Sequence, residues 1–180
     1  MLRKDMFTEE QNAIRDMIAK FVDNEIMPIR RELEKDPKLV ESVFQKLVDL
    51  GIQKAGYPPE YGGTGPGSPI TLGIICEELA RGDAGISVSV GINAGFVLQA
   101  AMVAGNKAVL DKFIPPFCGN DVNYACLSMT DSTGGADTEN PLFKGRGIKT
   151  RAVLDGDEWV INGSKSWPTH AGIASVYFTV

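Results

Sequence analysis

The sequence predicts an α+β protein in which an amino-terminal helical bundle is followed by a partial antiparallel β-domain. Over residues 1–120, apolar side chains recur at steps of three and four, the spacing of amphipathic helices. Beyond that point, short runs rich in β-branched and aromatic residues alternate with turns that contain Gly and Asp. We therefore expect a helical domain over 1–120 and an incomplete β-domain over 121–180.

The first two helices carry recognisable start and stop signals. Thr8 and Gln11 have the spacing of a capping box, so a helix is expected to begin there. Pro28 should stop or bend it. A second helix is expected over about 37–50, with Gly51 in the left-handed conformation after its end. The inward face of the first helix is expected to comprise Ile14, Met17, Ile18, Phe21, Val22 and Ile26.

The later helices follow a loop rich in Gly and Pro. Ser68 and Pro69 suit the N-cap and first turn of a third helix. The stretch 84–106 has no charged residue and is long enough to cross a bilayer. Its Gly and polar residues, however, favour a helix buried in protein. A last helix is expected to begin at Asn106 and to end before Pro115. The inward residues of the third helix are expected to be Ile70, Ile74, Ile75 and Leu79.

Four strands are expected in the second half. A hairpin turn is predicted at 155–157, and Asn162-Gly163 predicts a second tight turn of type I′. Because an apolar strand ends the sequence, we expect its sheet partners to lie downstream of Val180 or on another polypeptide. The strands are expected at 124–129, 148–154, 158–161 and 174–180.

Composition excludes several classes of protein. The net charge is −5 and no cluster of Lys and Arg is present, which argues against binding to nucleic acid. The amino terminus lacks the apolar segment of a secretory signal. The cysteines are too few and too scattered for a disulfide framework or a metal site, and they favour a reducing, cytoplasmic compartment. They are Cys76, Cys118 and Cys126.

Two segments of the second half carry candidate ligand-binding residues. Residues 126–137 read Cys-Leu-Ser-Met-Thr-Asp-Ser-Thr-Gly-Gly-Ala-Asp, a loop of small residues with Thr130 at its start. Such a loop can bring backbone N–H groups close to a flat polar ligand. Residues 162–169 read Asn-Gly-Ser-Lys-Ser-Trp-Pro-Thr and can deliver Trp167 and Thr169 to the same ligand. Taken singly, these side chains are more often turn, strand or core residues.

The two segments together resemble the flavin-binding middle domain of the acyl-CoA dehydrogenase family. That family usually reads Thr-Glu-Pro-x-x-Gly-Ser-Asp and then Asn-Gly-x-Lys-x-Trp-Ile-Thr-Asn. The helical half is similar to the family's amino-terminal domain at 7–11, 58–63, 77–81 and 83–85. The resemblance implies a three-part enzyme that ends in a four-helix bundle. This chain would supply the first part and about half of the second, without the carboxy-terminal bundle.

The resemblance also implies an activity. The complete enzyme would use FAD to form an α,β double bond in an acyl-CoA thioester and would pass electrons to an electron-transfer flavoprotein. It would be a homo- or hetero-oligomer. The family's proton-abstracting Glu normally comes from the carboxy-terminal bundle, so no catalytic residue is assigned in this chain, which we expect to be inactive alone. A non-catalytic or split subunit, and a flavin monooxygenase or nitroalkane-oxidising relative, remain alternatives.

Site residues follow from the motif positions. The cofactor-binding set is Leu127, Met129, Thr130, Gly135, Trp167 and Thr169. The substrate-binding set is Ala136, Ile92, Phe96 and Gln99. The chain departs from the usual motif at Asp131-Ser132, Ala136, Pro168 and His170, which suggests an uncommon acyl group or an atypical branch. His170 has no Ser, Cys or carboxylate at a recognisable spacing, so it is not assigned as a base.

Overall fold

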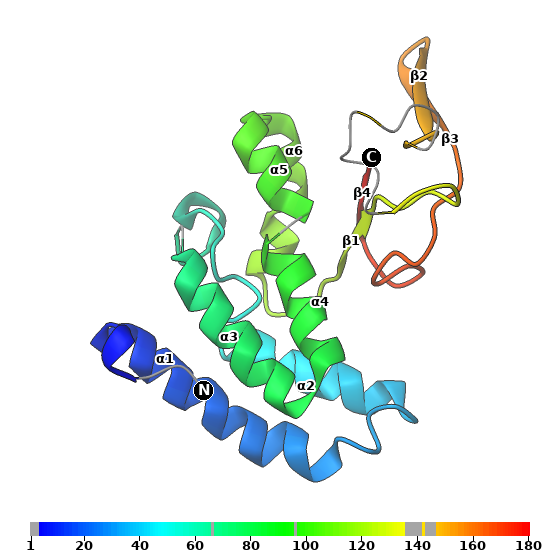
Figure 1. The fold of residues 1–180 in the computed structure, drawn as a ribbon. Coiled ribbons are helices and arrows are strands. Elements are labelled where there is room, and N and C mark those ends of the chain that lie inside the picture. The colour runs from blue at the N-terminus through cyan, green and yellow to red at the C-terminus, as the bar shows by residue number, and fades with distance from the viewer. Residues whose placement is uncertain (1–3, 66, 96, 136–141, 143–146) are drawn as a thin grey trace. The chain divides into compact units, whose positions relative to one another are not determined.

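The structure, a computed structural model, describes residues 4–65, 67–95, 97–135, 142 and 147–180 (Figure 1). The chain divides into two compact units, Met1–Asn123 and Tyr124–Val180, called unit 1 and unit 2 below. Unit 1 is helical and unit 2 holds the strands. The expected α+β class is confirmed.

Unit 1 is built on six α-helices within the described residues. Helix α3 contacts both α1 and α4, so it lies at the centre of the bundle (Figure 1). A π-helical turn and a 3₁₀ turn extend α1 past its end, at Val22–Ile26 and Met27–Ile29. The α-helices are α1 Glu9–Phe21, α2 Pro37–Asp49, α3 Pro69–Gly82, α4 Ala84–Gly95, α5 Val97–Ala104 and α6 Lys107–Phe113.

The predicted helix signals are confirmed. Thr8 and Gln11 form a reciprocal capping box, in which each backbone amide donates to the other's side chain at 3.1 and 3.2 Å. Ser68 accepts from the amide of Ile70 at the start of α3. Gly51 follows α2 with φ +80°, a conformation that glycine adopts without steric cost. These local features place the starts of α1 and α3 and the end of α2 where the sequence predicts them.

Two predicted core positions are wrong. Met17 is exposed, whereas Arg15, which the apolar pattern does not include, is only 2% exposed. Two residues lie about 200° apart around an α-helix, so the side that buries Arg15 turns Met17 outward. The Arg15 guanidinium is buried because its Nε donates to Glu78 Oε1 of α3 at 3.1 Å. Ile70, in the first turn of α3, is also exposed.

Helices α4 and α5 lie within the uncharged stretch 84–106. Helix α4 begins after Asp83, whose Oδ1 accepts from the amide of Ile86 at 2.9 Å. Among the residues that the structure describes, no helix has both the length and the apolarity to cross a membrane.

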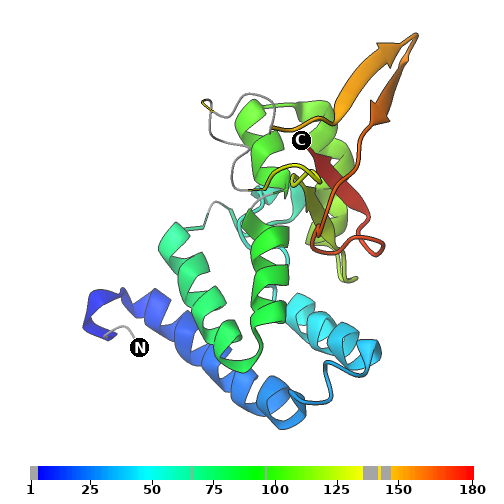
Figure 2. The same ribbon diagram turned by 45° about the vertical axis from the view of Figure 1, so that its right-hand side comes forward.

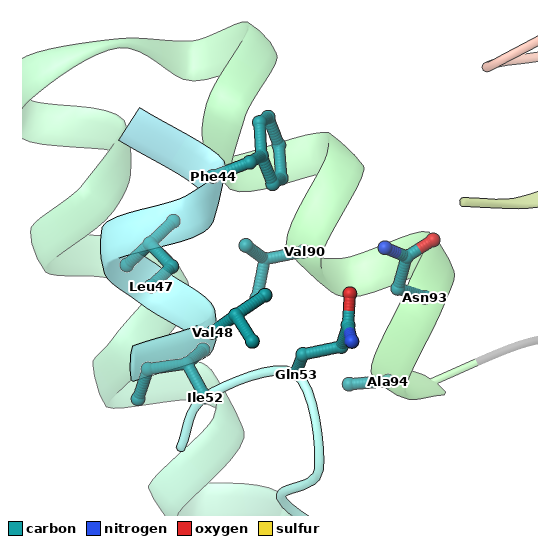
Figure 3. Close-up of a pocket in the computed structure, with 8 residues that line it drawn as sticks. All are labelled: Phe44, Leu47, Val48, Ile52, Gln53, Val90, Asn93 and Ala94. Carbon is teal, nitrogen blue, oxygen red and sulfur yellow. The ribbon is translucent and has the colours of Figure 1, made fainter. Parts of the chain in front are cut away.

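Helices α2 and α4 face each other across a small pocket of about 10 Å³, room for roughly one water molecule. Figure 3 shows apolar side chains of α2 directed at Val90 of α4, with two amide side chains at one side. The lining residues are Phe44, Leu47, Val48, Ile52, Gln53, Val90, Asn93 and Ala94.

Those two amide side chains attach the end of unit 1 to its core. Gln53 Nε2 donates to the carbonyl of Asp121 at 2.9 Å, and its Oε1 accepts from the amide of Asn123 at 2.8 Å. Asn93 Nδ2 donates to the carbonyl of Asn123 at 3.0 Å. Buried amides are stable only when their donors and acceptors are satisfied, so these bonds hold residues 121–123 against α2 and α4.

Unit 2 contains two small sheets. Strands β1 and β4 pair in parallel, with Leu127 opposite Phe178. Strands β2 and β3 form an antiparallel hairpin with Arg151 opposite Asn162, seen as two adjacent arrows in Figure 2. The strands are β1 Ala125–Ser128, β2 Arg151–Asp155, β3 Glu158–Asn162 and β4 Val176–Thr179.

Three expectations for unit 2 are wrong. The β1–β4 pairing is parallel rather than antiparallel, whereas the β2–β3 hairpin in the connection between these strands is antiparallel. The final strand, whose partners were expected only outside this chain, pairs with β1. The turn at Asn162-Gly163 is not type I′, since neither residue has positive φ. Gly163 is instead a site of close approach: a Cβ there would lie 2.3 Å from Thr150 Oγ1.

Candidate functional site

The two predicted ligand-binding segments adjoin each other in unit 2. The backbone amide of Ser166 donates to the carbonyl of Thr130 at 2.9 Å. Asp131 also forms a β-bridge with Lys165. Thr130 therefore lies beside the residue that precedes Trp167, although 37 positions separate the two in the numbering. The predicted convergence of the segments is present, while the roles of their side chains stay predictions.

Thr130 is the second residue after the end of β1 and is half-buried. Over the described part of the chain, neither its backbone amide nor its hydroxyl has a hydrogen-bond partner. Asp131 and Gly134 exchange two backbone hydrogen bonds of 3.1 and 3.2 Å, which close a tight turn after it. A Cβ at Gly135 would lie 3.6 Å from Thr130 Cγ2, an ordinary contact. Among the described residues, therefore, no close contact requires glycine at 135.

Trp167 has an unusual conformation. Its φ is +60°, and its side chain is 92% exposed. Positive φ in a bulky residue is a genuine outlier, and the Pro168 ring further restricts the residue before it. Strain of this kind persists only where surrounding structure imposes it. The chain thus holds a large flat indole away from its own core, an arrangement that suits contact with a planar ligand.

The turn after Trp167 is attached to β1 through His170. His170 Nδ1 lies 2.8 Å from the carbonyl of Ala125, and its ring stands 4.9 Å from the ring of Tyr124. Burial lowers the pKa of His170 below its usual value, which outweighs the opposing effect of the bond to Ala125. The neutral ring with Nδ1 protonated fits this arrangement. Thr169, which precedes it, is half-buried.

An ion pair between Asp131 and Lys165 joins the two segments more firmly. Their side chains meet at 2.7 Å and are 4% and 11% exposed. Asp131 also accepts hydrogen bonds from the amides of Lys149 and Thr150 and from the Thr150 hydroxyl. The Lys165 ammonium, together with these donors, holds the pKa of Asp131 well below its usual range. The carboxylate is therefore ionised throughout the physiological pH range.

The sequence reasoning missed this ion pair. By the motif alone, Asp131 is only a departure from the usual residue, and Lys165 has no assigned role. The available signal was the position of Lys165, which only one residue separates from the predicted ligand-binding Trp167. The pairing itself could not be read from the sequence, because the two residues are brought together only by the return of the chain after the β2–β3 hairpin.

The other predicted site residues are placed less distinctly. Leu127 is half-buried in β1. The carbonyl of Met129 accepts from Lys165 Nζ at 3.0 Å. Ile92 is half-buried in α4. Gln99 lies in α5, but its side chain is not described. Phe96 and Ala136 lie outside the described residues.

Unit 1 also contains an open cavity of about 800 Å³ that the sequence did not predict. It is bounded by α3, α4, α5 and the loop before α3, and its lining is mostly apolar. Val90 and Ala94 of α4 line it, whereas Ile92 is not among its described lining residues. This follows from helix geometry, because residues 90 and 94 share a face that 92 does not. Other apolar lining residues include Ile52, Leu72, Ile75 and Met102.

Comparisons with known proteins agree with the family resemblance. Residues 8–121 match the family described as acyl-CoA dehydrogenase, N-terminal domain. The chain is 35% identical over 174 residues to cyclohexane-1-carbonyl-CoA dehydrogenase of Syntrophus aciditrophicus (strain SB). That alignment covers 94% of this chain and 42% of the relative. The chain thus spans well under half the length of this relative.

Solved structures show the same fold. An acyl-CoA dehydrogenase complexed with FAD from Bacillus anthracis matches with a TM-score of 0.81 and 25% identity, over 98% of this chain and 29% of that one. A chain from the structural study of the electron transferring flavoprotein of Acidaminococcus fermentans matches with a TM-score of 0.79 and 26% identity, over 96% and 43%. The match over residues 8–121 extends over more than half of the 180 residues. The chain therefore belongs to the acyl-CoA dehydrogenase family.

Proposed function

We propose that this chain contributes the amino-terminal part of an FAD-dependent acyl-CoA dehydrogenase, which forms an α,β double bond in an acyl-CoA thioester. Family membership and the FAD complex of the Bacillus anthracis relative support this proposal. The proposal concerns the complete enzyme, since the chain corresponds to 42% of the Syntrophus relative.

One observation carries the flavin assignment. The hydrogen bond from Ser166 to Thr130 brings the first motif segment beside the second, directly before the exposed indole of Trp167. The chain thereby offers, within one unit, a large flat aromatic surface and the polar donors of Thr130, which have no partner among the described residues. An isoalloxazine has a planar body and a polar pyrimidine edge, so these groups match it in kind.

Each residue has a proposed role. The amide and hydroxyl of Thr130 donate to the polar edge of the ring, and fixed donors at that edge favour the reduced state. Trp167 covers the ring system and excludes water from it, while Thr169 offers a second hydroxyl. Leu127, Met129 and Gly135 form the wall beside Thr130. When bound, FAD supplies the hydride acceptor. The proton-abstracting carboxylate comes from outside these residues.

The substrate and partners are proposed from the same relatives. Ile92, Phe96, Gln99 and Ala136 are proposed to contact the acyl-CoA. We propose that electrons leave to an electron-transfer flavoprotein, which the structural match to the Acidaminococcus system supports. The three free cysteines suit a reducing compartment such as the cytoplasm. A homo- or hetero-oligomer is proposed for the complete enzyme.

The test is titration of the purified chain with FAD, followed by flavin fluorescence and the visible absorption spectrum. We expect saturable quenching, and a loss of affinity of about tenfold or more in Trp167→Ala, because stacking on the indole is lost. Acyl-CoA should not bleach the flavin bound to this chain alone. A wild-type chain that fails to bind FAD would contradict the proposal, and bleaching by the isolated chain would contradict the external position of the base.

A further inference from the structure

We propose that the ion pair between Asp131 and Lys165 is a positioning device that aims the backbone N–H of Thr130 at the flavin. The inference rests on the proposed function, because it assigns a purpose to that N–H.

Lys165 fixes the direction of the peptide group that carries this N–H. Its Nζ donates to the carbonyl of Met129 at 3.0 Å. In a planar trans peptide, the carbonyl of residue 129 and the N–H of residue 130 point in opposite directions. Anchoring the Met129 carbonyl on the ammonium therefore directs the Thr130 N–H away from Lys165, where it has no partner within the described residues.

The next peptide group is fixed as well. The carbonyl of Thr130 accepts from the Ser166 amide at 2.9 Å, and the amide of Asp131 donates to the carbonyl of Gly134 at 3.1 Å. Both peptide groups that flank Thr130 are therefore held by hydrogen bonds: the first through the Met129 carbonyl, the second through the Thr130 carbonyl and the Asp131 amide. Rotation of the Thr130 N–H would break the Lys165 bond at Met129 or the Ser166 bond at Thr130.

Asp131 holds the ammonium in place. The carboxylate pairs with Lys165 Nζ at 2.7 Å and accepts from the Thr150 hydroxyl at 3.0 Å and from the Thr150 amide at 3.2 Å. Lys165 Nζ also donates to the carbonyl of Val180 at 2.5 Å, so all three of its donors are engaged. A long, flexible lysine is otherwise a poor orienting group, and only such saturation makes it rigid.

Gly163 permits this approach. A Cβ at 163 would lie 2.3 Å from Thr150 Oγ1, the hydroxyl that is bound to Asp131. The chain can reach Lys165 along this path only if residue 163 lacks a side chain. Thr150, Asp131, Lys165 and Gly163 therefore form one mutually dependent group that ends at the Met129 carbonyl.

The experiment compares Lys165→Met with Lys149→Met in the full 180-residue chain. Methionine keeps the length of lysine but cannot donate to Met129. Lys149 is the matched control, because its side chain is exposed and only its backbone amide contacts Asp131. Each variant is first checked for wild-type circular dichroism and is then titrated with FAD. The reduction potential and the absorption spectrum of the bound flavin are measured next.

We expect the affinity of Lys165→Met for FAD to fall about tenfold or more, and the potential of its bound flavin to become more negative, because a donor at the pyrimidine edge is lost. Lys149→Met should stay within about twofold of wild type. Unchanged affinity and potential in a folded Lys165→Met would overturn the inference. A wild-type chain that does not bind FAD would instead overturn the proposed function.

A second variant covers the case in which Lys165→Met does not fold. Lys165→Gln is shorter and uncharged but can still donate, so we expect a smaller loss of affinity with the same direction of change in potential. Wild-type values in folded Lys165→Gln would also overturn the inference. So would the unfolding of both variants, since Lys165 would then serve stability rather than the direction of one N–H.

Discussion

At the scale of single residues, Trp167 combines a strained backbone with an exposed side chain. A φ of +60° in a residue other than glycine costs about 1–2 kcal/mol, and this indole recovers little of that cost by burial. Residues held in this way are concentrated at ligand contacts. We therefore expect Trp167 to lower the stability of the fold and to contribute to ligand binding.

The backbone strain at Trp167 predicts that glycine stabilises this position relative to alanine, the reverse of its usual effect. In Trp167→Gly the backbone strain is relieved, whereas in Trp167→Ala it remains, so the glycine variant should be the more stable of the two by about 1 kcal/mol. Both should lose affinity for FAD. The measurement is equilibrium unfolding in urea. A less stable glycine variant, as at ordinary positions, would show that residue 167 is not strained.

His170 introduces a pH dependence into unit 2. Because burial lowers the pKa of His170, its proton binds more tightly in the unfolded chain than in the folded one. The free energy of unfolding is therefore highest above the pH range in which an ordinary histidine titrates. It decreases as the pH falls through that range toward the pKa of His170 in the folded chain. Asp131 does not contribute there, because its pKa is held far below.

Unfolding experiments between about pH 7.5 and 5.5 should detect this loss, since the reference histidine pKa is about 6.5. His170→Asn should flatten the dependence: asparagine tolerates positive φ, can donate to the Ala125 carbonyl, and does not titrate in this range. An equally steep pH dependence in the asparagine variant would assign it to other groups.

At the scale of elements, α3 packs closely against the turn that follows α1, at a glycine near its end. A Cβ on Gly82 would lie 2.8 Å from Val22 Cγ1 and 2.9 Å from Ile26 Cγ2, both in the turn that follows α1. Gly73, in the same helix, has no atom within 4 Å of its Cβ position. A side chain at residue 82 would therefore clash with its neighbours, whereas one at residue 73 would meet none.

Alanine substitutions should separate these cases. Gly82→Ala should destabilise the chain by about 1–3 kcal/mol through overpacking against Val22 and Ile26. Gly73→Ala should instead stabilise it by up to about 1 kcal/mol, because alanine is the better helix former and meets no neighbour. Urea unfolding of both variants provides the comparison. If both substitutions changed the free energy of unfolding in the same direction, the helices α1 and α3 would be able to move apart more easily than their spacing indicates.

The contact between α1 and α3 also contains a buried ion pair. Glu78 of α3 accepts from Arg15 and from Arg81, at 3.1 Å in each case, and its side chain is nearly inaccessible. Truncating the charge of one partner leaves the other buried without compensation. Glu25, by contrast, pairs with Lys46 on the surface.

Glu78→Gln should therefore lower the free energy of unfolding by about 3–5 kcal/mol. Glu25→Gln, the matched control, should change it by no more than about 1 kcal/mol. The same denaturation experiment measures both. A mild effect at position 78 would indicate that water reaches this pair and supports the charge of Arg15.

At the scale of the whole molecule, the two units differ in how they bury apolar groups. Unit 1 has a continuous core that includes Ile18, Leu47 and Leu79. In unit 2 every residue of the β2–β3 hairpin is exposed, including Trp159 and Val153. The hairpin visible in Figure 2 relies mainly on its own cross-strand pairs.

Hydrogen exchange should report this difference. Amides in α3 should exchange about a hundredfold more slowly, or slower still, than those in β2 and β3, because the hairpin can open without disturbing a core. NMR or mass spectrometry under native conditions measures both regions in one sample. Equal protection would show that the hairpin unfolds only together with the rest of the chain.

Local signals in the sequence were sufficient for much of unit 1. The capping box at Thr8, the N-cap at Ser68 and the left-handed Gly51 each depend on residues only a few positions apart, and the structure has all three. Burial of Arg15 was not predictable in this way. An arginine interrupts an apolar pattern, and its partner Glu78 lies 63 positions away.

The candidate site shows the same division. The motif residues Thr130 and Trp167 could be proposed from a family resemblance, because a motif records residue types and their spacing. The ion pair of Asp131 with Lys165 could not, since complementary charges occur at many places in a chain and only the fold selects which ones meet. The parallel pairing of β1 with β4 was missed for a related reason: strand direction depends on the path between the strands.

The sequence by itself determined the capped starts of α1 and α3, the α+β class and the family, all of which follow from short-range capping, periodicity and motif spacing. Tertiary structure alone decided that Arg15 is inside and Met17 outside, that β4 returns to β1, and that Lys165 reaches the Met129 carbonyl. These features depend on distant segments of the chain meeting, and the free energy of such contacts is not encoded in any one stretch of residues.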